Sequence, residues 1–237
     1  MSTRSLREVL ARARDQNYLA LIVDLKMRSP RDGRLITENR LESYVQSLIE
    51  AGVDALAMPT DSRHFGGSIE LARRVRALCD VPLKRKEFFT AVHQMDQSRE
   101  AGFDAVQLSL STIPDPALFE ALRARAEEIG LEVVVGTHGR AQLEWAIAEG
   151  ARLIGINNRD ITALELDAGT VSATAALMPL VPDDVLVISE SSLLTREDVL
   201  RAARAGAHGV LIGTAVARSP DPAGWLRSLR AEPAWRR

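Results

Sequence analysis

The chain has 237 residues, of which 30 are Lys or Arg and 32 are Asp or Glu, so its formal net charge is −2. With 46% hydrophobic and 26% charged residues, the composition is that of a globular protein and excludes disordered, collagen-like and disulfide-scaffold classes. The near-neutral charge and the few aromatic residues (Phe 5, Tyr 2, Trp 3) argue against a nucleic-acid partner.

Cysteine usage and the first residues bear on where the protein works. A single cysteine, Cys79, cannot form an internal disulfide, which fits a reducing compartment. The first residues alternate charged and apolar side chains without the apolar core of a signal peptide, and the apolar run over 18–23 is too short to cross a bilayer. We therefore predict a cytoplasmic protein without a membrane partner, and the sequence leaves both a monomer and a homodimer open.

A short pattern recurs four times along the chain. It consists of the end of an amphipathic helical stretch, a glycine and a short apolar run, and its glycines are Gly52, Gly102, Gly150 and Gly206. A glycine there suits the left-handed conformation that ends many helices, and the apolar run is typical of a buried strand. The pattern predicts repeated units in which a helix leads into a strand.

Strand and helix candidates alternate along the whole chain. The predicted strands are 18–26, 54–59, 82–87, 104–110, 132–138, 153–158, 185–191 and 208–214, with helical patterns between them at 38–51, 68–79, 91–101, 116–129, 142–149 and 196–205. Eight such units favour a closed (β/α)8 TIM barrel over an open Rossmann sheet, because no strand is followed by G-x-G-x-x-G. We predict one domain over 1–237, in which a helical extension over 1–17 covers the bottom or edge of the barrel, and a polar loop over 28–34.

Charged and amide side chains stand at the carboxyl ends of four predicted strands. Residues two apart on a strand share a face. Asp24 and Lys26 on the first strand therefore point the same way, and so do Lys84 and Lys86 on the third. Barrel active sites lie at this edge, where lysines with carboxylates can hold an anion and supply general acids and bases. The alternative is that these groups form outward ion pairs with helices. The residues are Asp24, Lys26, Lys84, Lys86, Asn157 and Glu190.

The last two strands are each followed by small polar residues. Ser189-Glu-Ser-Ser192 and Gly213-Thr214 offer backbone N–H groups and hydroxyls just past a strand. Loops in these two positions of a barrel often bind phosphate, which favours a phosphorylated small-molecule substrate. His138 is a candidate at the mouth of the site. The histidines lack the spacing of metal ligands, so no metal site is predicted.

Six short segments follow one another in an order that is typical of one enzyme family. They are Asp24-Leu-Lys-Met-Arg-Ser-Pro30, Thr60-Asp-Ser-Arg-His-Phe-Gly-Gly-Ser68, Arg85-Lys-Glu-Phe88, Gly155-Ile-Asn-Asn-Arg-Asp160, Ser189-Glu-Ser191 and Leu211-Ile-Gly-Thr214. Together they resemble the indole-3-glycerol phosphate synthase family, the ring-closing barrel lyases of tryptophan biosynthesis. The resemblance implies a carboxy-lyase that acts on a 1-(2-carboxyarylamino)-1-deoxyribulose 5-phosphate, closes the ring, releases carbon dioxide and then water, and needs no cofactor.

The resemblance also implies a role for each matching residue. Lys86 would be the general acid on the ketone oxygen, and Lys26 would hold the carboxylate and assist dehydration. Asn157 and Glu190 would orient hydroxyls, and Asp24 would stand in place of a catalytic glutamate. The implied substrate-binding residues are Ser29, Ser192, Gly213 and Thr214 around the phosphate, Phe65 and Phe88 along the pocket, and Gln107, Gly136, Arg159, Ser191 and Leu211 elsewhere in the site.

Several positions depart from the family pattern. The fifth-strand motif V-E-V-H reads V-G-T-H here, so the catalytic glutamate is replaced by Gly136. Aliphatic residues on the third and fourth strands become Lys84 and Gln107. These changes lie where the aryl group is expected, whereas the ribulose-phosphate side matches the family. The groups that could take over the missing proton transfers are Glu190, Asp24, His138 and a water beside Gly136.

Three interpretations of function therefore remain open. The first is the family's lyase reaction, on the family's own aryl group or on a modified one. The second is a paralogue with a changed or partial reaction on a related phosphosugar adduct in specialised metabolism. The third is a non-catalytic binding barrel. Buried charges without a function cost stability, so the presence of Lys26, Lys86, Asn157 and Glu190 argues against the third.

Overall fold

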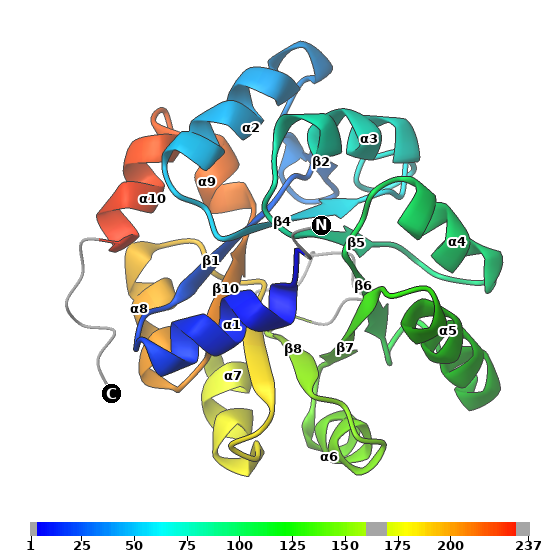
Figure 1. Cartoon of the computed structure of the whole chain (residues 1–237). Helices are drawn as coiled ribbons and strands as arrows, with labels where there is room; N and C mark the ends of the chain where they lie inside the picture. Colours follow the sequence, from blue (N-terminus) through cyan, green and yellow to red (C-terminus); the bar gives the residue numbers. More distant parts are fainter. Residues whose placement is uncertain (1–3, 160–169, 231–237) are drawn as a thin grey trace.

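Eight parallel strands close into a barrel that helices surround (Figure 1). The computed structural model describes residues 4–159 and 170–230. Within these residues the strands pair in the order β1-β10-β9-β8-β7-β6-β5-β4, and β4 pairs back with β1. They are β1 (Ala20–Asp24), β4 (Ala55–Pro59), β5 (Leu83–Lys86), β6 (Ala105–Ser109), β7 (Glu132–Thr137), β8 (Leu153–Asn157), β9 (Leu186–Glu190) and β10 (Gly209–Ile212). The predicted (β/α)8 TIM barrel is confirmed.

A helix follows each barrel strand and covers its outer side. These helices are α2 (Leu41–Glu50), α3 (Ile69–Leu78), α4 (His93–Glu100), α5 (Pro116–Glu128), α6 (Arg140–Ala148), α7 (Ser172–Leu177), α8 (Arg196–Arg204), and the pair α9 (Thr214–Arg218) and α10 (Pro222–Arg230); short 3-10 turns are η1 (Glu38–Arg40) and η3 (Met178–Leu180). Gly52, Gly102, Gly150 and Gly206 all have positive φ, as the recurring pattern predicted. Helices α2, α4, α6 and α8 are therefore each followed by a left-handed glycine that turns the chain into the next strand.

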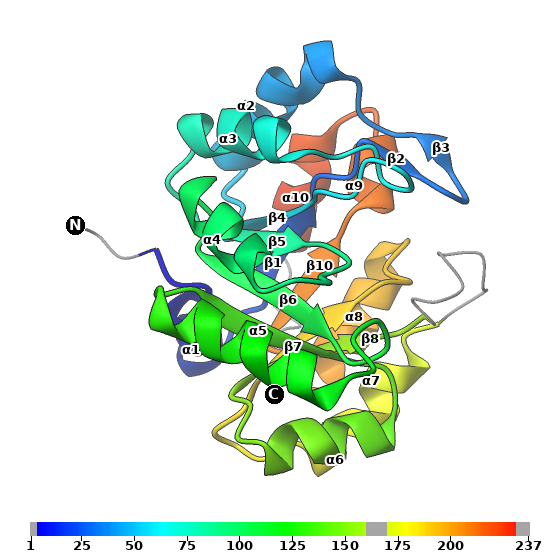
Figure 2. The same ribbon diagram turned by 90° about the vertical axis from the view of Figure 1, so that its right-hand side faces the viewer.

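The N-terminal helix α1 (Leu6–Asp15) closes one end of the barrel, where the strands begin (Figures 1 and 2). Leu6, Leu10 and Ala13 are fully buried in the same apolar cluster as Ala20 and Ile22 of β1. Leu10 lies so close to Gly209 that a Cβ there would meet its side chain at 2.6 Å. The predicted helical cover at the bottom of the barrel is confirmed, and the opposite end stays available for a site.

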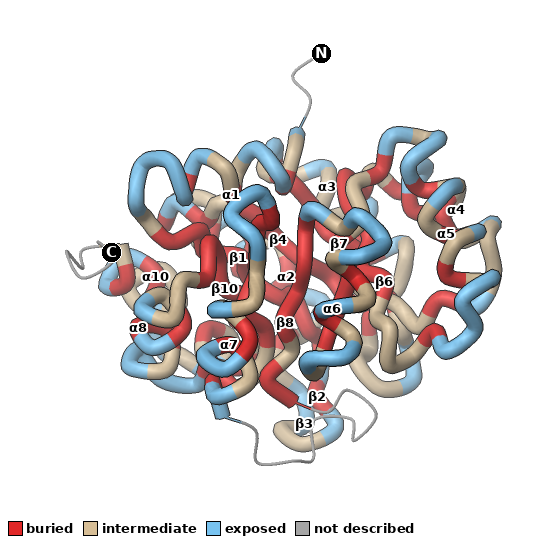
Figure 3. The backbone as a smooth tube through the Cα atoms, turned by 90° about the horizontal axis from the view of Figure 1, so that it is seen from below, coloured by how far each residue is buried: buried red, intermediate tan, exposed pale blue. Residues whose placement is uncertain are grey.

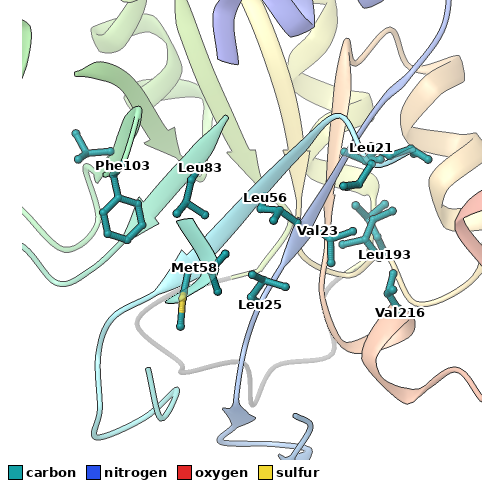
Figure 4. Close-up of a cluster of buried hydrophobic side chains, with 14 of the residues drawn as sticks. Leu21, Val23, Leu25, Leu56, Met58, Leu83, Phe103, Leu193 and Val216 are labelled. Carbon is teal, nitrogen blue, oxygen red and sulfur yellow. The ribbon is translucent and has the colours of Figure 1, made fainter. Parts of the chain in front are cut away.

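The barrel strands are buried on both faces, whereas the helices expose one face (Figure 3). One apolar cluster fills the barrel interior and includes Ile22, Val134 and Ile188. A larger one lies between the barrel and the helices; its members include Leu21 and Val23 (Figure 4). Neighbouring residues of β1 thus enter different clusters, which is the alternation expected of a strand buried on both sides.

A small hairpin interrupts the segment that was predicted as a polar loop. Strands β2 (Arg28–Ser29) and β3 (Gly33–Arg34) pair antiparallel immediately after β1. Figure 2 shows the hairpin at the end of the barrel opposite α1, where the strands finish. The prediction of a loop was wrong in this detail, because Gly33 adopts a positive φ of 72° and lets the chain turn back on itself.

Candidate active site

Lysine is confined to one region of the molecule. The chain has 30 Lys and Arg residues, and its lysines are Lys26, Lys84 and Lys86, so all other side chains of this kind are arginine. Lys84 and Lys86 are on β5, and Lys26 follows β1 by two residues. Arginine stays charged at any working pH, whereas lysine can give up a proton. The three lysine ammonium groups of the chain are therefore gathered toward the carboxyl end of the barrel.

Lys86 and Asp24 form an ion pair across the mouth of the barrel. Lys86 Nζ lies 2.9 Å from Asp24 Oδ2, and the lysine side chain is 24% exposed, while that of Asp24 is 4% exposed. The other carboxylate oxygen, Asp24 Oδ1, is buried and accepts no hydrogen bond from the described residues. A buried carboxylate oxygen without a hydrogen-bond donor is unfavourable unless a ligand or a water molecule donates to it. We therefore expect a water or a bound ligand at this atom.

A second ion pair lies deeper in the barrel, and its lysine stands two residues before Lys86 on β5. Lys84 Nζ donates to Glu190 Oε1 and to Gln107 Oε1, each at 2.6 Å, and Gln107 Nε2 donates to Glu190 Oε2, also at 2.6 Å. All three side chains are buried. We call this closed set the triad. Gly155 leaves room for it, because a Cβ there would lie 2.9 Å from Glu190 Oε1.

The triad favours the ionised form of Glu190 and donates hydrogen bonds to both of its carboxylate oxygens. Burial alone would raise the pKa of its carboxyl, but the charges of Lys84 and Lys86 and the hydrogen bonds from Lys84 and Gln107 hold that pKa below its ordinary value. Burial lowers the pKa of Lys84, and the charge of Glu190 opposes that shift. Each oxygen of Glu190 already accepts one side-chain hydrogen bond, so part of the acceptor capacity of this carboxylate is used within the triad.

A polar pocket opens above the Lys86–Asp24 pair. Its lining residues are Asp24, Lys26, Lys86, Arg159, Ser191, Ser192, Leu193, Leu194, Leu211, Gly213 and Thr214. Lys26 passes over Gly213, where a Cβ would meet Lys26 Cε at 3.0 Å. Arg159 Nε donates to Ser192 Oγ at 3.2 Å. Three cationic side chains and the hydroxyls of two loops thus face one small space, which suits an anion.

Ser191 and Ser192 turn the chain sharply at the end of β9. Both have positive φ, 66° and 58°, which is uncommon outside glycine. Strain of this kind persists where the surroundings hold the residue in place, and it is frequent at binding sites. Here it brings Ser192 Oγ to Arg159 and places both serines in the wall of the pocket.

The hairpin brings a further carboxylate to this rim. Asp32 Oδ2 accepts from Ser29 Oγ and from Thr214 Oγ1, each at 3.4 Å, and Asp32 pairs with Arg31 at 3.1 Å and with Arg218 at 3.4 Å. Burial alone would raise the pKa of Asp32, but the hydrogen bond from Arg31 and the charges of Arg31, Arg218 and Lys26 hold it below its ordinary value. Sequence reasoning missed Asp32; the signal was a charge at the tip of the first strand's loop.

Two aromatic side chains stack at the edge of the site. The rings of Phe65 and Phe88 lie 6.5 Å apart at 25°, and His64 packs edge-on against both. They come from the segments that follow β4 and β5, next to the end of β5 that carries Lys86. An offset aromatic stack offers a flat apolar surface, on which an aryl ring can pack.

The structure brings most predicted residues to one end of the barrel, though not all to the pocket. Nine of them line it, namely Asp24, Lys26, Lys86, Arg159, Ser191, Ser192, Leu211, Gly213 and Thr214. Gln107 and Glu190 lie beneath it in the triad, and Ser29 binds Asp32 beside it. Phe65 and Phe88 form the stack, and Asn157 Oδ1 accepts from the backbone N–H of Arg159 at 3.1 Å. Asp160, the last residue of its segment, lies outside the described residues.

Two expectations need correction. Ser189, the first of the small polar residues expected just past the seventh strand, lies within β9, and its hydroxyl is buried and bonds to Asn158 and Thr174, because Ser189 faces away from the barrel interior. The space expected beside Gly136 is partly filled, since a Cβ there would meet Gln107 Nε2 and Ser109 Cα at 3.2 Å. His138 reaches the same rim, with Nδ1 3.2 Å from the carbonyl oxygen of Asn157.

Residues 4–159 and 170–230 contain neither a metal-binding cluster nor a membrane-spanning helix. These residues hold no group of three or more His, Cys, Asp or Glu side chains that is arranged to bind a metal ion. They also form no helix with the length and apolarity that a membrane span requires. The fold and the polar rim together define a (β/α)8-barrel protein with a lysine-rich polar pocket at the carboxyl ends of its strands.

Comparison with known proteins narrows this class. The family model described as indole-3-glycerol phosphate synthase matches residues 1–229. Proteins of that name from Nocardioides sp. and Thermococcus kodakarensis are each 36% identical, over 89% of this chain and 79% and 91% of their own lengths. The one from Carboxydothermus hydrogenoformans is 34% identical over 96% of this chain and 85% of its own. The chain belongs to the indole-3-glycerol phosphate synthase family.

Solved structures that resemble the chain share its fold at lower identity. Thiamine phosphate pyrophosphorylase from Pyrococcus furiosus has a TM-score of 0.65 and 17% identity, and covers 95% of this chain and 96% of its own. The 3-hexulose-6-phosphate synthase from Salmonella typhimurium has a TM-score of 0.69 and 14% identity, over 89% and 96%. At these identities the likeness shows the barrel fold alone.

Proposed function

We propose that this protein is a carboxy-lyase of the indole-3-glycerol phosphate synthase type. Its substrate is a 1-(2-carboxyarylamino)-1-deoxyribulose 5-phosphate, and its products are the indole glycerol phosphate, carbon dioxide and water. The observation that carries the proposal is the Lys86–Asp24 pair, which stands at the floor of a cationic pocket in a chain whose other basic residues are nearly all arginine. Family membership over nearly the whole chain supports the same reaction.

Lys86 serves as the general acid in this proposal. As the aryl ring carbon attacks the ketone carbon, the ketone oxygen gains a proton from the ammonium group and becomes a hydroxyl. Loss of carbon dioxide then restores the aromatic ring, and the hydroxyl takes a proton from the Lys26 ammonium group and leaves as water. An ammonium group beside a carboxylate and an anionic substrate keeps its proton until the oxygen takes it, which suits an acid. Lys86 is the partly exposed lysine of β5, within reach of a bound molecule.

Asp24 is the base that we propose for the dehydration. Loss of water requires that the methylene carbon next to the nitrogen gives up a proton. Both oxygens of Glu190 accept hydrogen bonds within the triad, whereas Asp24 lines the pocket and its Oδ1 accepts no hydrogen bond from the described residues. Lys26 neutralises the substrate carboxylate, and Asn157 and Arg159 position the hydroxyls from the end of β8.

The phosphate binds, in this proposal, at the loops after β9 and β10. Ser192 and Thr214 provide hydroxyls, Gly213 provides close backbone approach, and Ser29 closes the group from the hairpin. We call these four residues the phosphate cradle. The aryl group extends toward the other side of the barrel, over the stack of Phe65 and Phe88 and past Gln107 and Gly136.

The test uses the unmodified aryl substrate and mass spectrometry. The lyase reaction releases carbon dioxide and water and forms a fluorescent indole. A second candidate function is favoured by Gln107, whose amide occupies part of the space that a side chain at position 136 would fill. On that alternative the protein closes the ring and decarboxylates without dehydration, and the product is heavier than the indole by one water. Absence of both products at high enzyme concentration contradicts the proposal.

Further parts of the proposal concern the whole protein. We propose that the entire chain folds as one domain, that it works in the cytoplasm, and that it binds neither nucleic acid nor membrane. The single buried cysteine and the near-neutral charge support these points. Size-exclusion chromatography with light scattering distinguishes a monomer from a homodimer, both of which are compatible with the barrel.

A further inference from the structure

Two of the three hydroxyls of the phosphate cradle, those of Ser29 and Thr214, are already bound to a carboxylate of the protein itself. Asp32 Oδ2 accepts from Ser29 Oγ and from Thr214 Oγ1, and Arg218 reaches Asp32 Oδ1 at 3.4 Å and the Asp32 carbonyl oxygen at 3.0 Å. The side chain of Asp32 is only 9% exposed, although it sits at the tip of a surface hairpin. The arrangement of hydroxyls and cations around it is one that would equally suit a phosphate oxygen.

We propose that Asp32 is an internal competitor for the phosphate cradle, a specificity-determining carboxylate that the phosphate of the substrate must displace. The inference rests on the proposed function, since it needs a phosphate at Ser29 and Thr214. Two anions that share the same hydroxyls would stand within about 5 Å of each other and repel, so the hairpin has to withdraw Asp32 before phosphate binds.

The surroundings of Asp32 explain why it binds there in the first place. The charges of Arg31, Arg218 and Lys26 all favour its ionised form, so at neutral pH the rim holds a carboxylate among three cations. The hairpin that carries Asp32 is short, and β2 and β3 pair through two residues each. Its backbone is tied to the β4–α3 segment by the bond from Arg28 N to the carbonyl oxygen of Phe65, at 3.0 Å. Because so few residues pair within the hairpin, its tip can open at small cost while the bond from Arg28 holds its base.

Displacement of Asp32 imposes the same cost on every anion that enters the cradle. Anions that form few bonds, such as chloride or a lone carboxylate, do not recover that cost and are excluded at ordinary concentrations. A phosphate that is attached to a substrate with further contacts in the pocket does recover it. Asp32 therefore lowers the affinity of the site for every anion, so that only anions with further contacts bind. It also links phosphate binding to the position of the hairpin that forms part of the rim.

The test measures binding of inorganic phosphate to the full-length protein by calorimetry. We expect Asp32→Asn to bind phosphate about tenfold more tightly than the wild type, because the competing charge is gone while the side chain keeps its size. Asp32→Ala should shift affinity in the same direction. The matched control is Glu38→Gln, which removes an exposed carboxylate of the same β1–α2 connection and should leave phosphate affinity and turnover unchanged.

A second variant separates this inference from the proposed function. Thr214→Val in the Asp32→Asn background should weaken phosphate binding about tenfold, since it removes a cradle hydroxyl. If it does, and Asp32→Asn alone binds no more tightly than the wild type or Glu38→Gln, the inference is wrong and the cradle stands. If Thr214→Val has no effect, phosphate binds elsewhere, and both the cradle and the inference are wrong. In turnover assays the KM of Asp32→Asn should fall while that of Glu38→Gln does not.

Discussion

Lys84 Nζ lies 2.6 Å from Glu190 Oε1, and both side chains are almost completely buried inside the barrel. The pair joins the ends of β5 and β9, which lie on opposite sides of the closed sheet. Gln107 bonds to both members and completes the triad. The net contribution of such a buried ion pair to the free energy of unfolding is small. Removal of one partner is strongly destabilising, because the other charge is then left unpaired in the interior.

Lys84→Met should therefore destabilise the protein far more than an ordinary surface change. Removal of the ammonium group leaves Glu190 buried without its counter-charge, which costs about 3–5 kcal/mol of unfolding free energy. The double variant Lys84→Met with Glu190→Gln should recover most of this loss, since no buried charge remains. Urea unfolding of the two single variants and the double variant gives the coupling. Additive losses in the double variant would contradict the pairing.

Acid should reveal the same carboxylate. The folded-state pKa of Glu190 lies below its ordinary value, so its contribution to stability is complete above the unfolded pKa and is lost as the pH falls through the folded pKa. We expect Glu190→Gln to flatten the decline in unfolding free energy between about pH 5 and pH 3, measured by urea unfolding. Glu144→Gln, at an exposed position of α6, is the control and should keep the decline of the wild type. An equal decline in all three proteins would show that Glu190 is not held ionised.

Gly136→Glu tests the strand position where the family has its glutamate. The new side chain must start 3.2 Å from Gln107 Nε2 and Ser109 Cα, so we expect a loss of about 1–3 kcal/mol of stability and no gain in turnover. Gly136→Ala introduces only the Cβ and should lose less. The double variant Gly136→Glu with Gln107→Ala removes the amide side chain and makes room for the new glutamate. Its turnover should then exceed that of Gln107→Ala alone. Higher turnover from Gly136→Glu by itself would show that Gln107 gives way freely.

The barrel was predictable because its signals are local and repeated. Glycines after four of the helices and the short apolar runs mark the units, and the inward charged or amide side chains of β1, β5, β8 and β9 stand at strand ends where a packed barrel has little use for them. The pairing of those charges was not predictable. Whether Lys84 meets Glu190 or Asp24 depends on the register across the closed sheet, which no local pattern contains.

Asp32 and Ser189 show the same limit in opposite directions. Asp32 looked like one charge of a polar loop, and only the β2–β3 turn brings it to Thr214, which is 182 residues away in the chain. Ser189 stood in a polar run at the end of the strand predicted over 185–191, and because β9 runs through Glu190, alternate residues of that run face opposite sides. Motif reading finds the polar residues at strand ends, and the strand's exact last residue decides which of them face the site.

The reaction itself tests the central claim most directly. Wild-type protein is mixed with 1-(2-carboxyphenylamino)-1-deoxyribulose 5-phosphate, and indole fluorescence and product mass are followed beside Lys86→Met, with unfolding curves to verify that both are folded. We expect the wild type to form indole and Lys86→Met to lose at least about 10²-fold in kcat, since it lacks the general acid. Equal turnover by Lys86→Met would contradict the assignment of the acid, and no product from folded wild-type protein would contradict the lyase.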